Sequence, residues 1–257
     1  MLHHLTIKDV FRQYLLFLLL SFFLFNGLSL NAENCLTVAE GAPKKRPALQ
    51  WVSLFDGKTL KGWKKTNFGG EGEVNVKKGE VIMDLGNDLT GIHTDRKLPK
   101  INYEVELESK RIEGNDFFCG LTFPVKKKSC SLILGGWGGT TVGLSSIDGA
   151  DASENNTTQY HKFENKKWYK IRLRITEASI KVWLDEKIII EQEIKGRKLS
   201  IRPEVDPSLP FGIACFQTTA GLKNIRIRKL TKKEIEKSKI VKKKTSPQKT
   251  TVPPTND

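Results

Sequence analysis

The feature that most limits the fold is an alternation of apolar and polar residues with a period of two. Between residues 101 and 108, Ile, Tyr, Val and Leu alternate with Asn and Glu. Between residues 169 and 176, apolar residues alternate with Lys, Arg and Thr. Successive side chains of a β-strand point to opposite faces, so each segment predicts a strand with one apolar and one solvated face.

Further short segments share β-branched and aromatic residues and are separated by turn residues. They are residues 74–76, 80–84, 117–123, 130–134, 141–144, 180–184, 188–191, 211–216 and 222–228. No convincing amphipathic helix is present. A string of short strands is typical of an all-β protein, and we expect an antiparallel β-sandwich with one two-sheet core.

The two ends of the chain differ from this pattern. Lys8 and Arg12 precede an apolar run at residues 14–25 that is too short to favour a membrane span. We therefore expect a signal peptide at 1–32, ending at Ala32, with a retained membrane anchor as the alternative. The layout continues with a linker at 33–49, the β domain at 50–230 and a disordered Lys-rich tail at 231–257. The chain is then exported, to a periplasmic or extracellular location.

The formal net charge of +14 is strongly basic. Nucleic acid is one partner for such a chain, but no nucleic-acid motif is present, and an exported protein meets anionic lipids and polysaccharides first. We expect no nucleic-acid partner and weak contact of the tail with anionic cell-surface material. The sequence does not indicate the oligomeric state.

Four cysteines, Cys35, Cys119, Cys130 and Cys215, allow three disulfide pairings, and the sequence does not choose among them. A turn centred near Lys126 would place Cys119 opposite Ile133 and not opposite Cys130. We therefore favour isolated buried thiols.

One segment of this basic chain lacks bases: no Lys or Arg lies between Lys128 and Lys162. A carboxylate without a nearby base escapes ion pairing, which would lower its pKa and weaken it as a general base. The candidate catalytic residues are Asp148, Asp151, Glu154, His161 and Asp116. Each also has a structural alternative, such as turn formation by the Asp148-Gly149 pair or a hydrogen-bonded role for His161.

Four residues are candidates for substrate binding. Trp137 lies in G-G-W-G-G, where small neighbours leave its ring accessible for stacking on a sugar, although a core position at a strand end is the alternative. Asn155 lies in the segment without Lys or Arg, next to Glu154. Arg202 and Glu204 lie in I-R-P-E and belong either to the mouth of the same site or to a surface ion pair. Trp168, in a framework motif, is assigned to the core.

Several motifs resemble one known family. They are L-F-D-G-K-T-L-K-G-W at 54–63, the strand I-N-Y-E-V-E-L-E-S-K, the pair K-W-Y-K-I-R-L-R-I and I-K-V-W-L-D, and the ending G-L-K-N-I-R-I-R-K-L. Together they resemble the 3-keto-disaccharide hydrolase family, also known as domain of unknown function 1080. The middle of the chain, N-D-F-F-C-G-L-T-F-P-V onward, is similar to a planctomycete-type subgroup.

The resemblance implies a concanavalin A-like jelly roll of the laminin-G/glucanase type, export, and cleavage of sugars oxidised at C3. Oxidation at C3 acidifies the C2 proton, so a base can start elimination of the group at C1. The enolate oxygen then needs a donor or a metal, for which a divalent cation is a candidate cofactor. The alternative function is a non-catalytic carbohydrate-binding or surface-adhesion module.

Overall fold

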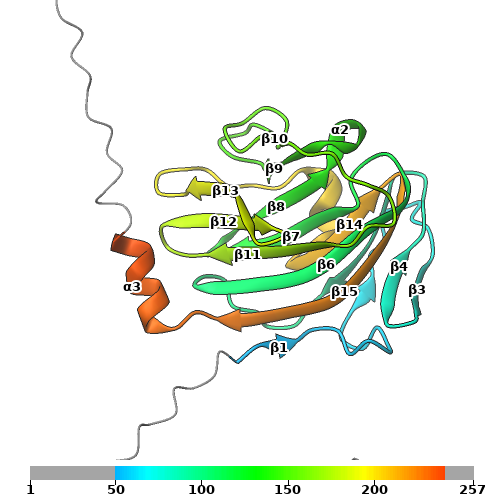
Figure 1. Cartoon of the computed structure of the whole chain (residues 1–257), viewed down its shortest axis with the longest axis horizontal. Coiled ribbons are helices and arrows are strands. Elements are labelled where there is room, and N and C mark those ends of the chain that lie inside the picture. The colour runs from blue at the N-terminus through cyan, green and yellow to red at the C-terminus, as the bar shows by residue number, and fades with distance from the viewer. Residues whose placement is uncertain (1–49, 241–257) are drawn as a thin grey trace, which may run out of the picture. The chain divides into compact units, whose positions relative to one another are not determined.

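Two antiparallel β-sheets pack face to face in the computed structural model, which describes residues 50–240 (Figure 1). The predicted all-β sandwich is therefore confirmed. The predicted signal peptide, the linker with Cys35, and the tail from residue 241 lie outside the described residues.

One sheet has eight strands and is called the charged sheet below, after its outer face. In spatial order its strands are β13 (Lys187–Glu193), β12 (Ser179–Leu184), β11 (Tyr169–Ile175), β6 (Tyr103–Gly114), β15 (Thr218–Lys229), β4 (Glu80–Met83) and β3 (Val74–Lys77), with β1 (Val52–Ser53) also pairing with β15. The two segments with the clearest alternation, β6 and β11, pair directly, with Leu173 opposite Val105.

The other sheet has seven strands and is called the cleft sheet. In spatial order its strands are β10 (Gln159–Tyr160), β9 (Thr141–Ser145), β8 (Lys128–Gly135), β7 (Cys119–Val125), β14 (Phe211–Phe216), β5 (Leu89–Thr94) and β2 (Lys64–Lys65). Strand β5 was not predicted, because its sequence L-T-G-I-H-T has no clear period. The short α2 (Gly136–Gly139) joins β8 to β9, and the 3-10 helix η1 (Pro203–Ser208) precedes β14.

The core lies between the sheets and contains the apolar faces of both. Tyr103 of β6 is fully buried, and its hydroxyl donates to the carbonyl of Pro124 (2.7 Å). Trp63 is also buried and donates from Nε1 to the carbonyl of Leu54 (2.7 Å). Trp168, assigned to the core from sequence, is only half-buried, and the Lys223 ammonium lies 4.1 Å from the centre of its ring.

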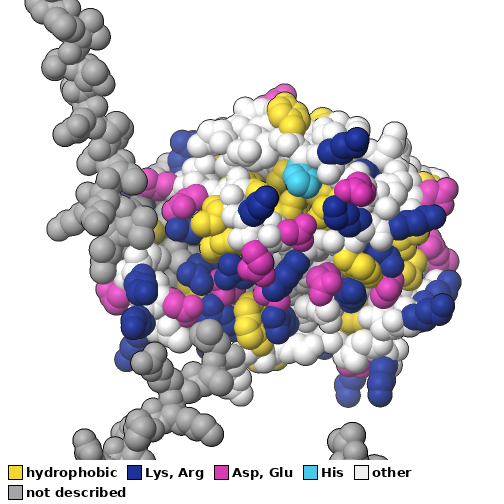
Figure 2. All heavy atoms as spheres, viewed as in Figure 1, with side chains coloured by type: hydrophobic (Ala, Val, Ile, Leu, Met, Phe, Trp, Pro, Cys, Tyr) yellow, Lys and Arg dark blue, Asp and Glu magenta, His cyan; other side chains and the backbone are white. Residues whose placement is uncertain are grey.

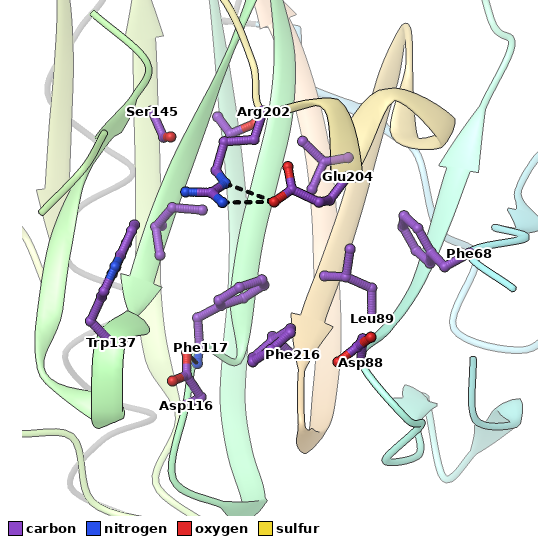
Figure 3. A pocket seen from close by; sticks show the side chains of 13 residues that line it. Phe68, Asp88, Leu89, Asp116, Phe117, Trp137, Ser145, Arg202, Glu204 and Phe216 are labelled. Atoms are coloured by element: carbon purple, nitrogen blue, oxygen red, sulfur yellow. Dashed lines mark hydrogen bonds and ion pairs between the residues drawn. The ribbon is translucent and has the colours of Figure 1, made fainter. Parts of the chain in front are cut away.

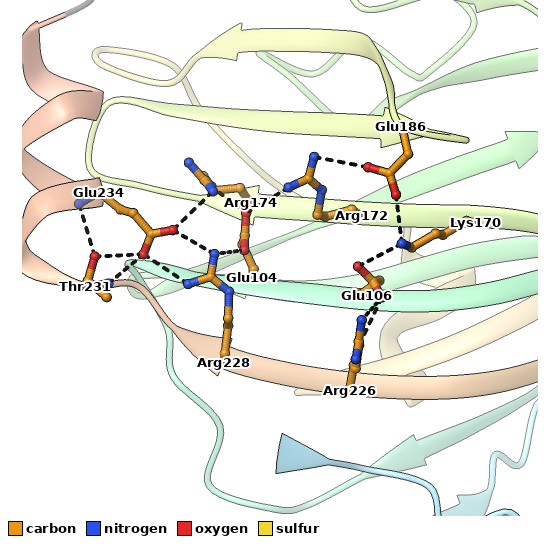
Figure 4. Close-up of polar contacts among 10 residues, drawn as sticks. All are labelled: Glu104, Glu106, Lys170, Arg172, Arg174, Glu186, Arg226, Arg228, Thr231 and Glu234. Carbon is orange, nitrogen blue, oxygen red and sulfur yellow. Dashed lines mark hydrogen bonds and ion pairs between the residues drawn. The ribbon is translucent and has the colours of Figure 1, made fainter. Parts of the chain in front are cut away.

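The outer face of the charged sheet carries ion pairs centred on two glutamates of β6 (Figure 4). Glu104 accepts from Arg174 Nε (2.6 Å) and pairs with Arg228, and none of its surface is exposed. Glu106 accepts from Arg226 Nε (2.9 Å). A buried carboxylate needs such partners. The sheet face predicted to be solvated therefore contains a buried glutamate, Glu104, that is covered by and paired with arginines. Figure 2 shows basic and acidic side chains interspersed over this side of the domain.

The chain after β15 forms the helix α3 (Lys232–Ile240), where the sequence analysis expected the disordered tail to begin. Thr231 and Glu234 form a capping box: the Glu234 carboxylate accepts from the Thr231 N–H (2.8 Å), and the Glu234 N–H donates to Thr231 Oγ1 (3.3 Å). Glu234 also accepts from both terminal nitrogens of Arg228 (3.0 and 2.8 Å). Composition alone missed the helix because the Arg228 contacts depend on β15, although the capping box itself is a local sequence signal.

The three described cysteines, Cys119, Cys130 and Cys215, are free and buried, as favoured from sequence. The β7–β8 turn places Cys119 opposite Leu134, one residue from the expected partner. Burial raises the pKa of each thiol to about 12.

No helix within residues 50–240 is long and apolar enough to cross a membrane.

Replacing Glu234 tests the attachment of α3. The pKa of Glu234 is lowered from 4.5 to about 2, chiefly by hydrogen bonds from Arg228. Its stabilising effect is therefore complete above pH 4.5 and is lost as the pH falls towards 2. We expect Glu234→Gln to reduce the free energy of unfolding at pH 7 by about 1–2 kcal/mol, since a hydrogen bond to a charged group is lost.

Urea denaturation from pH 7 to pH 3 measures this, with Glu113→Gln at an exposed position of β6 as the control. The difference between wild type and Glu234→Gln should shrink below pH 4.5. A difference that is constant with pH would contradict the assignment.

Candidate active site

A cleft of about 570 Å³ lies on the outer face of the cleft sheet. Alternation along β8 explains its position: Ser131 and Ile133 line the cleft, while Leu132 and Leu134 belong to the core. The complete lining is Phe68, Asp88, Leu89, Asp116, Phe117, Ser131, Ile133, Trp137, Ser145, Arg202, Glu204, Val205 and Phe216 (Figure 3).

Two stacked phenylalanines form the floor of the cleft. The rings of Phe117 and Phe216 lie 5.8 Å apart at an interplanar angle of 22°, and the Phe216 N–H donates to the Phe117 carbonyl (3.0 Å). Gly120 makes room for this arrangement, because a Cβ there would lie 2.9 Å from the Phe117 ring. The floor offers a flat apolar surface of the kind that packs against the face of a sugar ring.

Trp137 stands at one side of the cleft, with Phe68 at the other (Figure 3). The turn that carries it has a left-handed backbone at Trp137 (φ 47°). Asp116 Oδ2 accepts from the Gly138 N–H (3.0 Å), and the buried Arg111 donates from Nη1 to the Gly139 carbonyl (3.5 Å). These contacts fix the backbone of the turn, and Trp137 on it is 45% exposed.

Arg202 and its two carboxylate partners form a polar ridge above the floor. Nε and Nη2 donate to Glu204 Oε1 (3.2 and 2.6 Å), and Nη1 pairs with Asp151. Asp151 Oδ1 also accepts from the hydroxyls of Ser145 (3.0 Å) and Ser146 (3.3 Å). Arg202 lowers the pKa of Glu204 below its ordinary value, and the hydrogen bond to Glu204 raises the pKa of Arg202.

A second cavity, of about 480 Å³, adjoins the cleft at this ridge. It is lined by Ser146, Gly149, Asp151, Glu154, Ser200, Ile201, Arg202, Pro203 and Glu204.

The predicted site residues divide between these places. Asp116, Trp137, Arg202 and Glu204 line the cleft, and Asp151 and Glu154 line the second cavity. Asp148, Asn155 and His161 line neither.

The expectation that the loop acids escape ion pairing is wrong for two of them. Asp148 pairs with Arg197 Nε (2.8 Å), and Asp151 pairs with Arg202. Both bases come from the segment before η1, which packs on the loop through the Ser146 N–H and the Ser200 carbonyl (2.7 Å). The segment without Lys or Arg thus receives its bases from elsewhere in the chain.

Two further predicted residues have structural contacts. The Asn155 side-chain amide donates to the carbonyls of Leu144 (2.7 Å) and Asp151 (2.6 Å) and so fixes the loop. His161 is exposed, its ring centre lies 4.6 Å from that of Phe163, and it does not line the cleft.

Sequence analysis missed Asp88, which lines the cleft just before β5. Its main-chain carbonyl accepts from Gln217 N–H (2.9 Å), but its exposed carboxylate has no hydrogen bond or ion pair to any residue within 50–240. The segment G-N-D-L-T has the composition of an ordinary turn, so only the fold distinguishes Asp88. Within the same residues, no group of three or more His, Cys, Asp and Glu side chains is placed to hold a metal ion.

An aromatic floor bordered by carboxylates and a guanidinium is a surface suited to sugars, and with the family match it indicates a glycosyl hydrolase-like or carbohydrate-binding domain. The chain belongs to the family described as the 3-keto-alpha-glucoside-1,2-lyase-like domain, whose model matches residues 50–228. This confirms the family resemblance seen in the sequence. A search of the curated proteins found no match.

Several solved structures are similar to this chain. Crh5 transglycosylase in complex with NAG has a TM-score of 0.50 and 13% identity, covering 70% of this chain and 84% of that chain. The carbohydrate binding module CBM66 from Bacillus subtilis has a TM-score of 0.46 and 16% identity, covering 65% and 95%. A protein of unknown function with a galectin-like fold, also from Bacillus subtilis, has a TM-score of 0.46 and 11% identity, covering 66% and 90%.

Replacing Asp116 tests how the Trp137 turn is held. Asp116→Ala removes the acceptor of the Gly138 N–H, so we expect hydrogen exchange at that amide to accelerate about tenfold or more, since a hydrogen bond to a charged group is worth about 1.5–3 kcal/mol. Exchange measured by NMR gives the result. Asp88→Asn is the control and should leave Gly138 unchanged; equal exchange in wild type and Asp116→Ala would show that the turn is held by other contacts.

Proposed function

We propose that this domain cleaves the glycosidic bond of 3-keto-glycosides, by elimination followed by addition of water. One observation carries the proposal: an unpaired carboxylate, Asp88, and a guanidinium with free donors, Arg202, border the same aromatic floor. Family membership supports the substrate class.

In this mechanism the keto sugar packs on Phe117 and Phe216, with Trp137 at its edge. Asp88 takes the proton from C2, and the electron pair forms the C2–C3 double bond of an enolate. The C3 carbonyl then re-forms, the electron pair moves to form a C1–C2 double bond, and the C1–oxygen bond breaks with its electrons leaving on the oxygen. The leaving oxygen takes a proton from water, the resulting hydroxide adds to C1, and Asp88 returns its proton to C2. Asp88 suits the role of base better than Glu204, because Arg202 lowers the pKa of Glu204.

Arg202 suits the role of donor to the enolate oxygen. A guanidinium has five N–H groups. Three nitrogen contacts, to Asp151 and Glu204, leave one N–H on each terminal nitrogen. Because its carboxylate partners hold the group in place, no rearrangement is required when charge develops on the substrate.

The second candidate function is a carbohydrate-binding module without catalysis. The exposed Trp137 beside a stacked aromatic floor favours it, since stacking alone can bind a sugar. For either function we propose action after export, in line with the leader expected from sequence.

The discriminating assay is release of the leaving sugar from 3-keto-glucosides and 3-keto-trehalose, beside the unoxidised parent sugars, with and without a divalent cation. We expect cleavage of the keto sugars alone. Asp88→Asn should lower kcat/KM by a factor of about 10²–10⁴, the usual contribution of a positioned base. Asp95→Asn is the matched control and should retain activity. Asp95 is an exposed acid that follows the other end of β5 and pairs with Lys64.

Failure of the folded wild-type domain to cleave any keto sugar would reject catalysis. Binding of the same sugars, lost in Trp137→Ala and kept in Asp88→Asn, would then establish the binding module.

A further inference from the structure

The cleft and the second cavity are separated by a ridge of only a few side chains. Arg202 and Glu204 line both cavities. At the sheet edge, Ser145 lines the cleft and the next residue, Ser146, lines the second cavity, and both hydroxyls donate to Asp151. A ligand that crosses the Arg202–Glu204 pair therefore passes directly from one cavity into the other.

The two cavities differ in chemistry. The cleft has an aromatic floor, whereas no aromatic residue lines the second cavity. Serine hydroxyls, carboxylates and the open backbone at Gly149 line it instead, and a Cβ at Gly149 would meet no atom within 4 Å. Its volume of about 480 Å³ falls within the range of about 300–1,000 Å³ that is common for small-ligand sites.

From this continuity we infer that the second cavity is the subsite for the leaving sugar, and that it takes a neutral sugar unit. The inference rests on the proposed function, which places the reacting ring on the aromatic floor and Arg202 beside it. The bond that breaks then lies at the ridge, and the group beyond it enters the second cavity. The domain should accordingly favour a saccharide of at least two units over a glycoside with a small leaving group.

Charge determines which sugar the second cavity accepts. Asp151, Glu154 and Glu204 line it, with Arg202 as the single cation among its lining residues. Carboxylates accept hydrogen bonds from sugar hydroxyls. A uronate in the same position would face an excess of negative charge, so an acidic leaving sugar should react poorly.

Two substrates with the same reacting ring test this subsite. A 3-keto-glucosyl-glucose fills both cavities, whereas methyl 3-keto-glucoside fills the cleft alone. Ser200→Phe places a large side chain at an exposed position that lines only the second cavity. Ser53→Phe, at an exposed position on the charged sheet, is the matched control.

We expect Ser200→Phe to lower kcat/KM for the disaccharide at least about tenfold, because binding outside the reacting centre is lost. The kcat/KM for the methyl glycoside, which does not reach the second cavity, should change less than about twofold. Ser53→Phe should match the wild type on both. A disaccharide with glucuronic acid as the leaving unit should react about tenfold more slowly, and Glu154→Gln should recover part of that loss.

Equal losses on both substrates, or no loss on either, would overturn the subsite. A glucuronide that reacts as well as the glucoside would overturn its preference for a neutral sugar. If the wild type cleaves nothing, calorimetric binding of the two sugars separates the proposals: weaker binding of the disaccharide alone by Ser200→Phe would support the subsite without catalysis, and no binding of either sugar would reject both.

Discussion

The geometry of the site depends on one guanidinium. Arg202 joins the loop after β9, through Asp151, to the start of η1, through Glu204. Backbone hydrogen bonds between Ser146 and Ser200 (2.7 and 3.1 Å) already hold the loop against the segment before η1, and the guanidinium adds the side-chain contacts at the mouth of the site. Two carboxylates on one planar cation fix both distance and orientation, which a single lysine contact would not. Arg202 and these backbone hydrogen bonds together position the wall that the two cavities share.

The shape of the cleft depends equally on small side chains. Gly120 leaves the space that the Phe117 ring occupies, and Phe117 in turn stacks on Phe216. The aromatic floor thus rests on bare sheet backbone, whose polar groups are already satisfied by strand pairing. The sheet supplies rigidity, and the connections between strands supply the polar groups that give the cleft its chemistry.

Sequence alone predicted the sandwich, because the alternation of apolar and polar residues along β6 and β11 shows which face of each strand is buried. It also singled out Trp137, whose glycine neighbours are a local signal, and Asp116, Arg202 and Glu204, which line the cleft. It did not predict that Asp148 pairs with Arg197, since partners far apart in sequence meet only through strand order. Asp88 was missed for the same reason: its role depends on which strands lie beside β5.

The buried thiols have a practical consequence. Cys119, Cys130 and Cys215 are almost completely shielded, and a pKa of about 12 keeps them protonated near neutral pH. The thiolate is the nucleophile that attacks alkylating reagents, so in the folded domain both burial and the raised pKa protect these three thiols. Each reacts only when the sandwich opens around it, and Cys119 and Cys215 sit on neighbouring strands of the cleft sheet. The rate at which each native cysteine is alkylated, followed by mass spectrometry, therefore reports how often that sheet opens, and no label has to be introduced.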